Sequence, residues 1–226
     1  MAQTPAQFTL VIDTSNPVCF AGILDAKHHW LAYQSNEGPA LEILFSKVET
    51  VLTEAELSLN EITSYLYCEG PGSTLGLRLA AMAIKTWRAL HVRQPPCFAY
   101  HSLQLAAHCL KKDQPKLLNA LIVADWKKDT WNAVFIKQGV VATGKTISQA
   151  KLEAWQGSVY HLPQRKGWQA PPSDAITMPY TPERIHELID APRFLRPVDI
   201  PVPFASAPSN FQKWIPDRHR AFSPDA

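Results

Sequence analysis

The sequence predicts an α/β fold, and three observations support that prediction. Apolar runs of strand length alternate with segments in which apolar residues recur every three or four positions. The turn Gly70-Pro71-Gly72 stands between two of these elements and is typical of a sharp strand-to-helix corner. Hydrophobic residues make up 46% of the 226 residues, enough for a large core or for two lobes that share one. We therefore expect sheets flanked by helices, organised around the Gly-Pro-Gly turn.

The first part of the chain predicts three strands and a helix. The strands occupy 8–12, 18–24 and 30–34, and short clusters of turn-forming residues separate them. Such tight connections favour an antiparallel meander. Apolar side chains at helical spacing then predict an amphipathic helix over 39–55.

The Gly-Pro-Gly turn follows an apolar run at 62–68, which predicts a strand covered on both faces. From Ser73 to Leu90 there is no proline, and one apolar stripe includes Leu75 and Met82. We expect this segment to be a helix that buries the stripe. Ser73 is the expected N-cap, because its hydroxyl can accept a hydrogen bond from a backbone N–H of the first turn.

The middle of the chain repeats the combination of strands and helices. Strands are predicted at 97–100, 118–124 and 131–137, with 140–143 as a short extension, and a helix is predicted at 102–110. The second half therefore resembles the first in its order of elements, although the two halves share no sequence repeat.

The last third of the chain gives a weaker pattern. A helix is predicted over 181–189, with Thr181 as its cap, Pro182 at its first position and Glu183 at its positive end. Prolines recur from Pro192 onward, and they predict an extended, largely irregular tail.

Charge and cysteine content limit the classes of function. The 22 basic and 20 acidic side chains leave a net charge of +2, which is too small for a general, charge-driven binder of nucleic acid. No apolar run approaches the ~20 residues of a membrane span, and no signal peptide is recognisable. We expect a cytoplasmic protein with buried, reduced thiols. The four cysteines are Cys19, Cys68, Cys97 and Cys109.

The loop after the first strand is the first candidate site. A carboxylate and hydroxyls at a hairpin tip are able to hold phosphate and to position Mg²⁺ through water. A turn closed by the Asp or hydroxyl side chains explains the same residues without any ligand. The candidate phosphate-binding residues are Asp13, Thr14 and Ser15.

The Gly-Pro-Gly turn is the second candidate site. A helix N-terminus that follows such a turn is a potential anion site. Gly76 lies inside the predicted helix, where glycine costs about 1 kcal/mol relative to alanine, so we expect another element to approach closely there. That element belongs either to the same chain or to a partner. Arg78 is expected to pair with a carboxylate, again within the chain or across an interface.

The order and spacing of these motifs resemble the TsaB (YeaZ) family over roughly 8–136. The family pattern at the turn is Gly-Pro-Gly-Ser-Phe-Thr-Gly-x-Arg, and the chain has Gly70-Pro71-Gly72-Ser73-Thr74-Leu75-Gly76-Leu77-Arg78. Two weaker matches follow: Asp125 resembles the start of the family's Asp-Ala-Arg segment, and 192–196 resembles its terminal Pro-x-Tyr-Leu-Arg.

This resemblance implies a two-lobed actin/Hsp70/sugar-kinase-like (ribonuclease H-like) fold without catalytic residues of its own. Family members pair with the catalytic protein TsaD and with the ATPase TsaE to make N6-threonylcarbamoyladenosine at position 37 of tRNA. ATP and a metal are then expected in the partner subunits, and tRNA only through the complex. We place the N-terminal lobe with its pairing helices at 1–112 and a smaller C-terminal lobe with the proline-rich tail at 113–226.

The resemblance also implies a pairing surface, through which TsaB-like chains form homodimers as well. The expected interface residues are Gly70, Pro71, Gly72, Ser73, Leu75, Gly76, Arg78 and Leu79. The chain departs from the family pattern at Pro39-Ala40, where the family has His-Ser/Thr, and at Thr74-Leu75, where it has Phe-Thr. Both departures lie on or near the expected pairing surface, so a different partner is an open alternative.

Two enzymatic functions are alternatives to the accessory role. A nucleotide-dependent phosphotransferase of the same superfold would place Asp13 and Thr14 at the phosphate, but it needs a second glycine-rich phosphate loop. Between 145 and 226 the sequence has only isolated glycines, for example in Gln156-Gly157-Ser158 and Lys166-Gly167-Trp168. A metallopeptidase needs a His-Glu-x-x-His helix, and the sequence contains none.

Histidines and tryptophans are expected to be structural. None of the eight histidines has a second histidine four residues away, so we expect surface or capping histidines and no metal site. Tryptophans commonly complete cores, and we expect that role for those in the less regular segments. They are Trp126, Trp155, Trp168 and Trp214.

Overall fold

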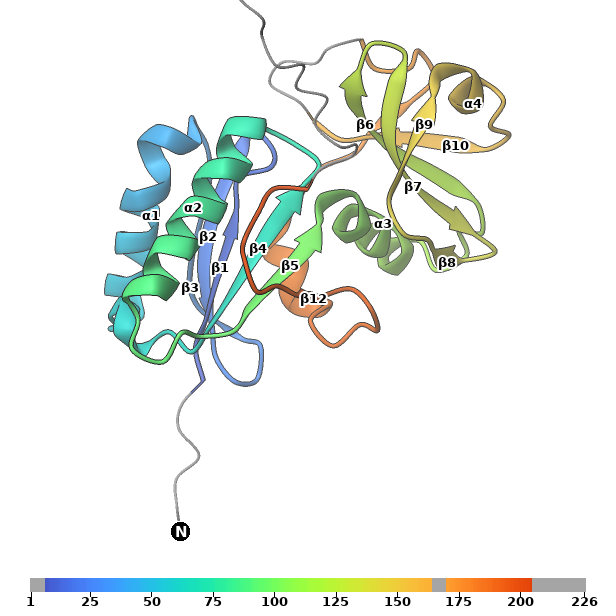
Figure 1. Cartoon of the computed structure of the whole chain (residues 1–226). Coiled ribbons are helices and arrows are strands. Elements are labelled where there is room, and N and C mark those ends of the chain that lie inside the picture. The colour runs from blue at the N-terminus through green and yellow to red at the C-terminus, as the bar shows by residue number, and fades with distance from the viewer. Residues whose placement is uncertain (1–6, 164–169, 205–226) are drawn as a thin grey trace, which may run out of the picture.

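Two mixed sheets with helices around them form the described part of the chain (Figure 1). The computed structural model describes residues 7–163 and 170–204. Sheet A has the strand order β12-β5-β4-β1-β2-β3, and sheet B has the order β11-β10-β6-β7-β8, with β9 also paired to β7. We call sheet A with α1 and α2 the first lobe, and sheet B with α4 the second lobe.

The strands of sheet A are those that the sequence predicted, with small changes at their ends. They are β1 (Thr9–Asp13), β2 (Val18–Leu24), β3 (Trp30–Glu37), β4 (Ser64–Gly70), β5 (Cys97–His101) and the additional β12 (Arg196–Pro197). β1, β2 and β3 form the expected antiparallel meander, and β4 and β5 follow in parallel to β1. The apolar run of β4 is buried on both faces, as its sequence predicted.

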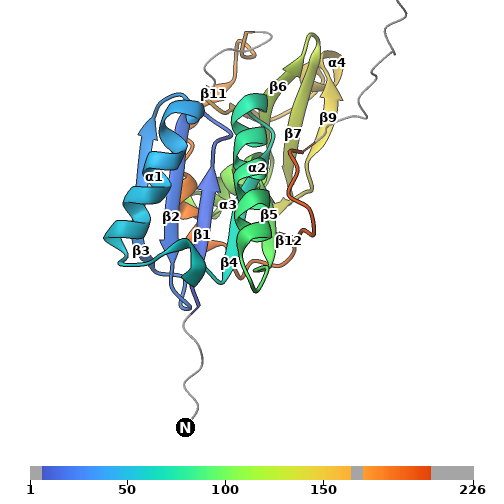
Figure 2. The ribbon, with the colours of Figure 1, turned by 60° about the vertical axis from the view of Figure 1, so that its left-hand side comes forward.

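Two helices cover one face of sheet A and lie side by side there (Figure 2). They are α1 (Ala40–Glu54) and α2 (Thr74–Leu90), which confirms both helix predictions. Ser73 is the N-cap of α2, and its hydroxyl accepts a hydrogen bond from the Gly76 amide at 3.3 Å, as expected. A core built around Leu10, Ile12 and Tyr67 fills the space between this sheet face and the two helices.

The other face of sheet A packs on α3 (Ser102–Asp113) and through it on sheet B. Sheet B contains β6 (Ala120–Lys127), β7 (Thr130–Lys137), β8 (Val140–Val141), β9 (Lys145–Ser148), β10 (Ser158–His161) and β11 (Ile176–Thr177). The helix α4 (Gln149–Glu153) follows β9, and the 3₁₀ helix η1 (Leu59–Glu61) precedes β4. β9, β10, β11 and α4 lie where the sequence pattern was too weak to predict them.

The end of the described chain returns to the first lobe, which corrects two predictions. The helix predicted over 181–189 is the 3₁₀ helix η2 (Pro182–Glu187), and its N-cap Thr181 makes no capping hydrogen bond with its side chain. η2 packs on β2, β3 and α3. The 113–226 boundary therefore does not hold for this segment, because apolar residues of η2 complete the core under sheet A.

The segment after η2 is also more ordered than the expected irregular tail. β12 pairs antiparallel with β5, the Val198 amide donates to the Cys97 carbonyl at 2.8 Å, and the Phe204 amide donates to the Glu69 carbonyl at 2.6 Å. The open edge of β5 offers backbone groups that need partners, and the tail supplies them. The segment 166–168, Trp214 and the prolines 208 and 216 lie outside the described residues.

The cysteine expectation is confirmed, since all four cysteines are buried and free. Among the helices in 7–163 and 170–204, none combines the length and the apolar character that a membrane crossing requires.

Candidate functional site

The carboxylate of Asp13 is fully buried at the end of β1. Its Oδ1 accepts hydrogen bonds from the Ser15 amide at 2.8 Å and from the Ser15 hydroxyl at 2.6 Å. Its Oδ2 accepts from the hydroxyls of Tyr100 and Tyr180, each at 2.5 Å. We call Asp13, Tyr100 and Tyr180 the carboxylate cluster. Four hydrogen-bond donors therefore surround one buried carboxylate, and a buried charge requires such partners.

The environment keeps the tyrosines of this cluster protonated. Burial, and then the nearby Asp13 charge, raise the pKa of Tyr100 and of Tyr180 well above the ordinary value. Burial and the same charge raise the pKa of the Cys68 thiol, whose sulfur lies 3.9 Å from the Tyr180 hydroxyl. The tyrosine hydroxyls are therefore donors at any neutral pH.

The Gly-Pro-Gly turn packs directly on the loop that follows Asp13. The Ser73 amide donates to the Ser15 carbonyl at 2.7 Å. A Cβ atom at Gly72 would lie 2.0 Å from the Ser15 carbonyl oxygen, and one at Gly76 would lie 2.4 Å from that of Thr14. Both glycines are required because backbone meets backbone here, so the close approach at Gly76 occurs within this chain.

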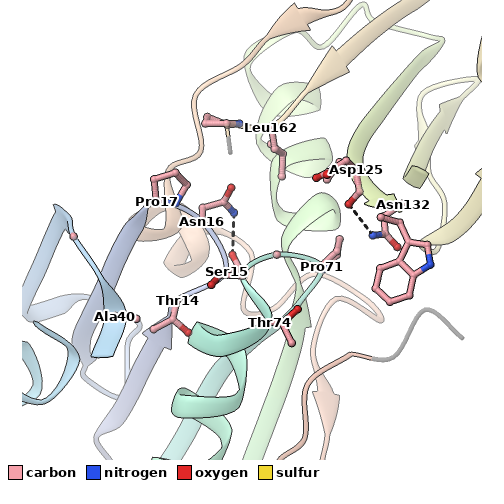
Figure 3. A pocket seen from close by; sticks show the side chains of 16 residues that line it. Thr14, Ser15, Asn16, Pro17, Ala40, Pro71, Thr74, Asp125, Asn132 and Leu162 are labelled. Atoms are coloured by element: carbon pink, nitrogen blue, oxygen red, sulfur yellow. Dashed lines mark hydrogen bonds between the residues drawn. The ribbon is translucent and has the colours of Figure 1, made fainter. Parts of the chain in front are cut away.

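A cavity of about 490 Å³ lies between the two lobes, beside this corner (Figure 3). Its first-lobe wall includes Thr14, Ser15 and Thr74, and its second-lobe wall includes Asp125 and Asn132. Asp13 is not among the lining residues. Asp125 is the one formally charged side chain among the described residues that line the cavity. Half-buried Trp126 also lines it, so this indole borders the cavity and does not sit deep in a core.

The outward side of α1 and α2 exposes large apolar side chains. Leu41 and Phe45 of α1 are 56% and 50% exposed, and Leu75 and Met82 of α2 are 59% and 57% exposed. We call these four residues the outer helical face. The apolar stripe of α2 is wider than the part that sheet A covers, so the expectation that the whole stripe is buried is wrong. An exposed patch of this kind is typical of an interaction surface.

The charges around the outer helical face are divided by helix. The exposed charged residues of α1 are acidic: Glu42, Glu49 and Glu54. Those of α2 are basic: Arg78 and Lys85. The one lysine of α1, Lys47, is buried and donates to Asn36 at 2.5 Å. Arg78 makes no hydrogen bond or ion pair with any residue in 7–163 or 170–204, so the expected carboxylate partner is not found within that part of the chain.

Comparison with known proteins gives the fold. No family model matches the chain, and no curated protein matches it. YeaZ from Pseudomonas aeruginosa superposes with a TM-score of 0.56 at 18% identity, over 69% of this chain and 75% of YeaZ. A second structure, described as an uncharacterised protein similar to the peptidase YeaZ from Pseudomonas aeruginosa, gives 0.58 at 16% identity, over 80% of this chain and 90% of that one. The chain has the YeaZ fold. This confirms the two-lobed fold class expected from the sequence.

Within this YeaZ fold, the predicted interface residues divide into two sets. Leu75 and Arg78 are exposed and Leu79 is partly exposed, so they are accessible to a partner. Gly70, Pro71 and Gly76 are buried, which corrects their assignment to a partner surface. They serve the turn instead, where the Pro71 carbonyl also accepts from the Ser102 hydroxyl at 2.7 Å. Gly72 and Ser73 are exposed and line the cavity. Sequence reasoning missed Phe45 and Leu41 as surface residues.

The positions of the described histidines of this chain match the expectation only in part. His91 is the C-cap residue of α2, and its Nε2 lies 3.0 Å from the Asn60 carbonyl oxygen. His101 is the N-cap residue of α3, although it is buried and its side chain makes no capping hydrogen bond. His161 is buried in β10, so the surface or capping prediction is wrong for it. Burial lowers the pKa of His101 to about 4 and also lowers that of His161. In the part of the chain that the structure describes, no group of three potential metal ligands comes together.

Proposed function

We propose that this chain is a non-catalytic accessory subunit of the TsaB (YeaZ) family, which pairs with a TsaD-type catalytic protein in the formation of N6-threonylcarbamoyladenosine on tRNA. A TsaE-type ATPase completes the assembly, and tRNA is contacted through the complex. ATP and a metal belong to the partner subunits. The observation that carries the proposal is the outer helical face, an exposed apolar surface on α1, which follows the third strand, and on α2, which follows the Gly-Pro-Gly turn.

The chemistry of this face suits a partner of similar fold. Its centre is apolar, and the phenyl ring of Phe45 is held against the Trp87 indole with ring centroids 6.2 Å apart. Acidic side chains border it on α1 and basic ones on α2. A partner with the same division of charge would bring unlike charges together when α1 of one subunit meets α2 of the other. A homodimer uses the same complementarity.

The carboxylate cluster supports the non-catalytic role. A phosphotransferase would need Asp13 to face bound phosphate or its metal ion, but four protein donors already surround its carboxylate and it is not among the residues that line the cavity. Thr14 and Ser15 do line the cavity and remain the candidate phosphate contacts. The carboxylate of Asp125 on the opposite wall opposes a phosphate ligand by charge. The arrangement therefore favours the accessory subunit over the phosphotransferase.

The test is co-purification with the TsaD-type protein of the same cell, with and without Met82→Glu. We expect a stable complex with the natural chain and at least a tenfold loss of affinity in the variant, because a charge is placed in the apolar centre of the face. The matched control is Val140→Glu, which changes an exposed apolar residue of the second lobe (68% exposed) in the same way and should bind normally.

Results of two kinds would contradict the proposal. The first concerns association: either the chain is a clean monomer that does not bind the TsaD-type protein, or it binds and Met82→Glu does not weaken the binding. The second is saturable binding of Mg·ATP in calorimetry that Asp13→Asn abolishes while the fold is kept, which would instead support the phosphotransferase.

A further inference from the structure

The carboxylate cluster joins segments that are far apart in the sequence. Tyr180 lies between β11, which belongs to sheet B, and η2, which packs on sheet A. Its bond to Asp13 spans 167 residues. The chain therefore passes from the second lobe back to the first at the point where Tyr180 reaches the end of β1.

A continuous set of hydrogen bonds leads from Tyr180 to the start of α2. The Tyr180 hydroxyl donates to Asp13 Oδ2, and Asp13 Oδ1 accepts from the Ser15 amide. The Ser15 carbonyl accepts from the Ser73 amide at 2.7 Å. The Ser73 hydroxyl then accepts from the Gly76 amide in the first turn of α2.

The packing along this path is tight where the loop after β1 meets the turn and α2, whereas its other side faces the cavity. The missing Cβ atoms at Gly72 and Gly76 let the turn and α2 touch the backbone of Ser15 and Thr14. Any displacement of the loop after β1 must therefore move the first turn of α2 or open a void beside it. Leu75, which belongs to the outer helical face, is in that same turn.

We propose that Tyr180 and Asp13 form a latch that couples the returning segment at 178–188 to the first turn of α2, and through it to the outer helical face. Order in one region stabilises the other, so binding at the outer helical face and protection of 178–188 are linked in both directions. Only the statement about binding rests on the proposed function; the coupling itself is a property of the free chain.

The two tyrosines of the cluster have different roles in this latch. Tyr100 is in β5 of the same sheet as Asp13, so its bond holds the carboxylate within the first lobe. Tyr180 alone in the cluster belongs to the segment that crosses between the lobes. The latch therefore depends on Tyr180, and Tyr100 sets the position of its acceptor.

The test is amide hydrogen exchange on the full chain with Tyr180→Phe, which removes one hydroxyl and keeps the ring. We expect exchange at 14–16, 73–77 and 178–188 to become about tenfold faster, while the rest of sheet A keeps its protection. The matched control is Tyr65→Phe. Tyr65 is also fully buried in sheet A, but its hydroxyl has no hydrogen-bond partner among the described residues, so exchange should not change.

The outcomes separate coupling from simple destabilisation. Normal protection at 73–77 in Tyr180→Phe, or a uniform acceleration over the whole chain, would overturn the latch. Tyr100→Phe provides a second variant in case Tyr180→Phe does not fold: because Tyr100 positions the Asp13 acceptor, 14–16 and 178–188 should loosen together. Loosening of 14–16 in Tyr100→Phe while 178–188 keeps its full protection would also overturn it.

The link between the latch and partner binding is tested in a separate exchange experiment. Addition of the TsaD-type partner should slow exchange at 178–188 in the natural chain and less so in Tyr180→Phe. If no partner binds, the proposed function fails and the latch is still judged by exchange in the free chain. If the partner binds without any change at 178–188, the link to the outer helical face is wrong.

Discussion

The inward side of the first turn of α2 and the outward side of the same helix are built in opposite ways. On the inward side, backbone packs on backbone, two glycines are needed, and the Ser73 amide, the Ser73 hydroxyl and the Pro71 carbonyl each have a hydrogen-bond partner inside the chain. Along the outward side, Leu75 and Met82 are more than half exposed and Arg78 has no partner in the described part of the chain. The difference teaches that the glycine motif serves folding, whereas the association in the proposed function would depend on the exposed side chains of the same helix.

Gly76→Ala should produce the largest effect on stability. Alanine is favoured over glycine in a helix by about 1 kcal/mol. That gain is outweighed here, because the new Cβ would lie 2.4 Å from the Thr14 carbonyl oxygen, a backbone atom that cannot rotate away. We expect a net loss of about 3 kcal/mol in the free energy of unfolding, measured by urea denaturation.

The comparison fails if Gly76→Ala is as stable as the natural chain and instead loses association. That result would mean that Gly76 contributes to the partner surface, as the sequence predicted. Ala83→Gly is the matched control in the same helix: it reverses the change at a buried site with no glycine requirement and should cost about 1–2 kcal/mol, from helix propensity and the lost burial of one methyl group.

The second-largest effect on stability is expected at His101, which is buried at the end of β5. Its ring lies against Phe204 at a centroid distance of 4.9 Å and against Gly144 of the second lobe. Burial lowers its pKa from 6.5 to about 4, so the unfolded chain binds a proton in this pH range and the folded chain does not. Stability therefore falls as the pH is lowered from about 6.5 towards 4.

The size of this effect follows from the two pKa values. Between pH 7 and pH 5 the histidine should remove about 2 kcal/mol of stability, measured as the free energy of unfolding at each pH. His101→Gln should flatten that part of the profile, whereas His29→Gln, at an exposed histidine, should leave it unchanged. An unaltered profile in His101→Gln would show that the ring is more accessible than its 6% exposure implies.

Local sequence patterns were sufficient for the first lobe because its elements are long and its turns use diagnostic residues. Ser73 was predicted as a cap from its position alone, and it caps α2. β12 and β11 have two residues each and depend on pairing with distant strands, so periodicity cannot detect them. The carboxylate cluster was equally out of reach, because no local signal joins Asp13 to Tyr180.

The candidate site was predicted in part for the same reason. Asp13, Thr14 and Ser15 were found as a polar hairpin tip, but the sequence does not reveal that Asp13 faces the protein interior and its neighbours face the cavity. For α2, the helical spacing predicts the apolar stripe but not which part of the stripe is buried. How much of a stripe is covered depends on the width of the sheet beneath it, which is a tertiary property.

The smallest effect should come from Arg78→Glu at the border of the outer helical face. The side chain is exposed and has no partner in the described residues, so the free energy of unfolding should change by less than about 0.5 kcal/mol. Association with the partner should weaken by roughly three- to tenfold, mainly through a slower association rate, and the effect should diminish as salt is added. Surface plasmon resonance at low and high salt measures the affinity and the association rate.

For a homodimer, Glu42→Lys in the same chain should restore part of the lost affinity, because the division of charge between α1 and α2 is re-established with opposite sign. Equal affinities for the natural chain and Arg78→Glu at low salt would mean that the outer helical face acts through its apolar residues alone.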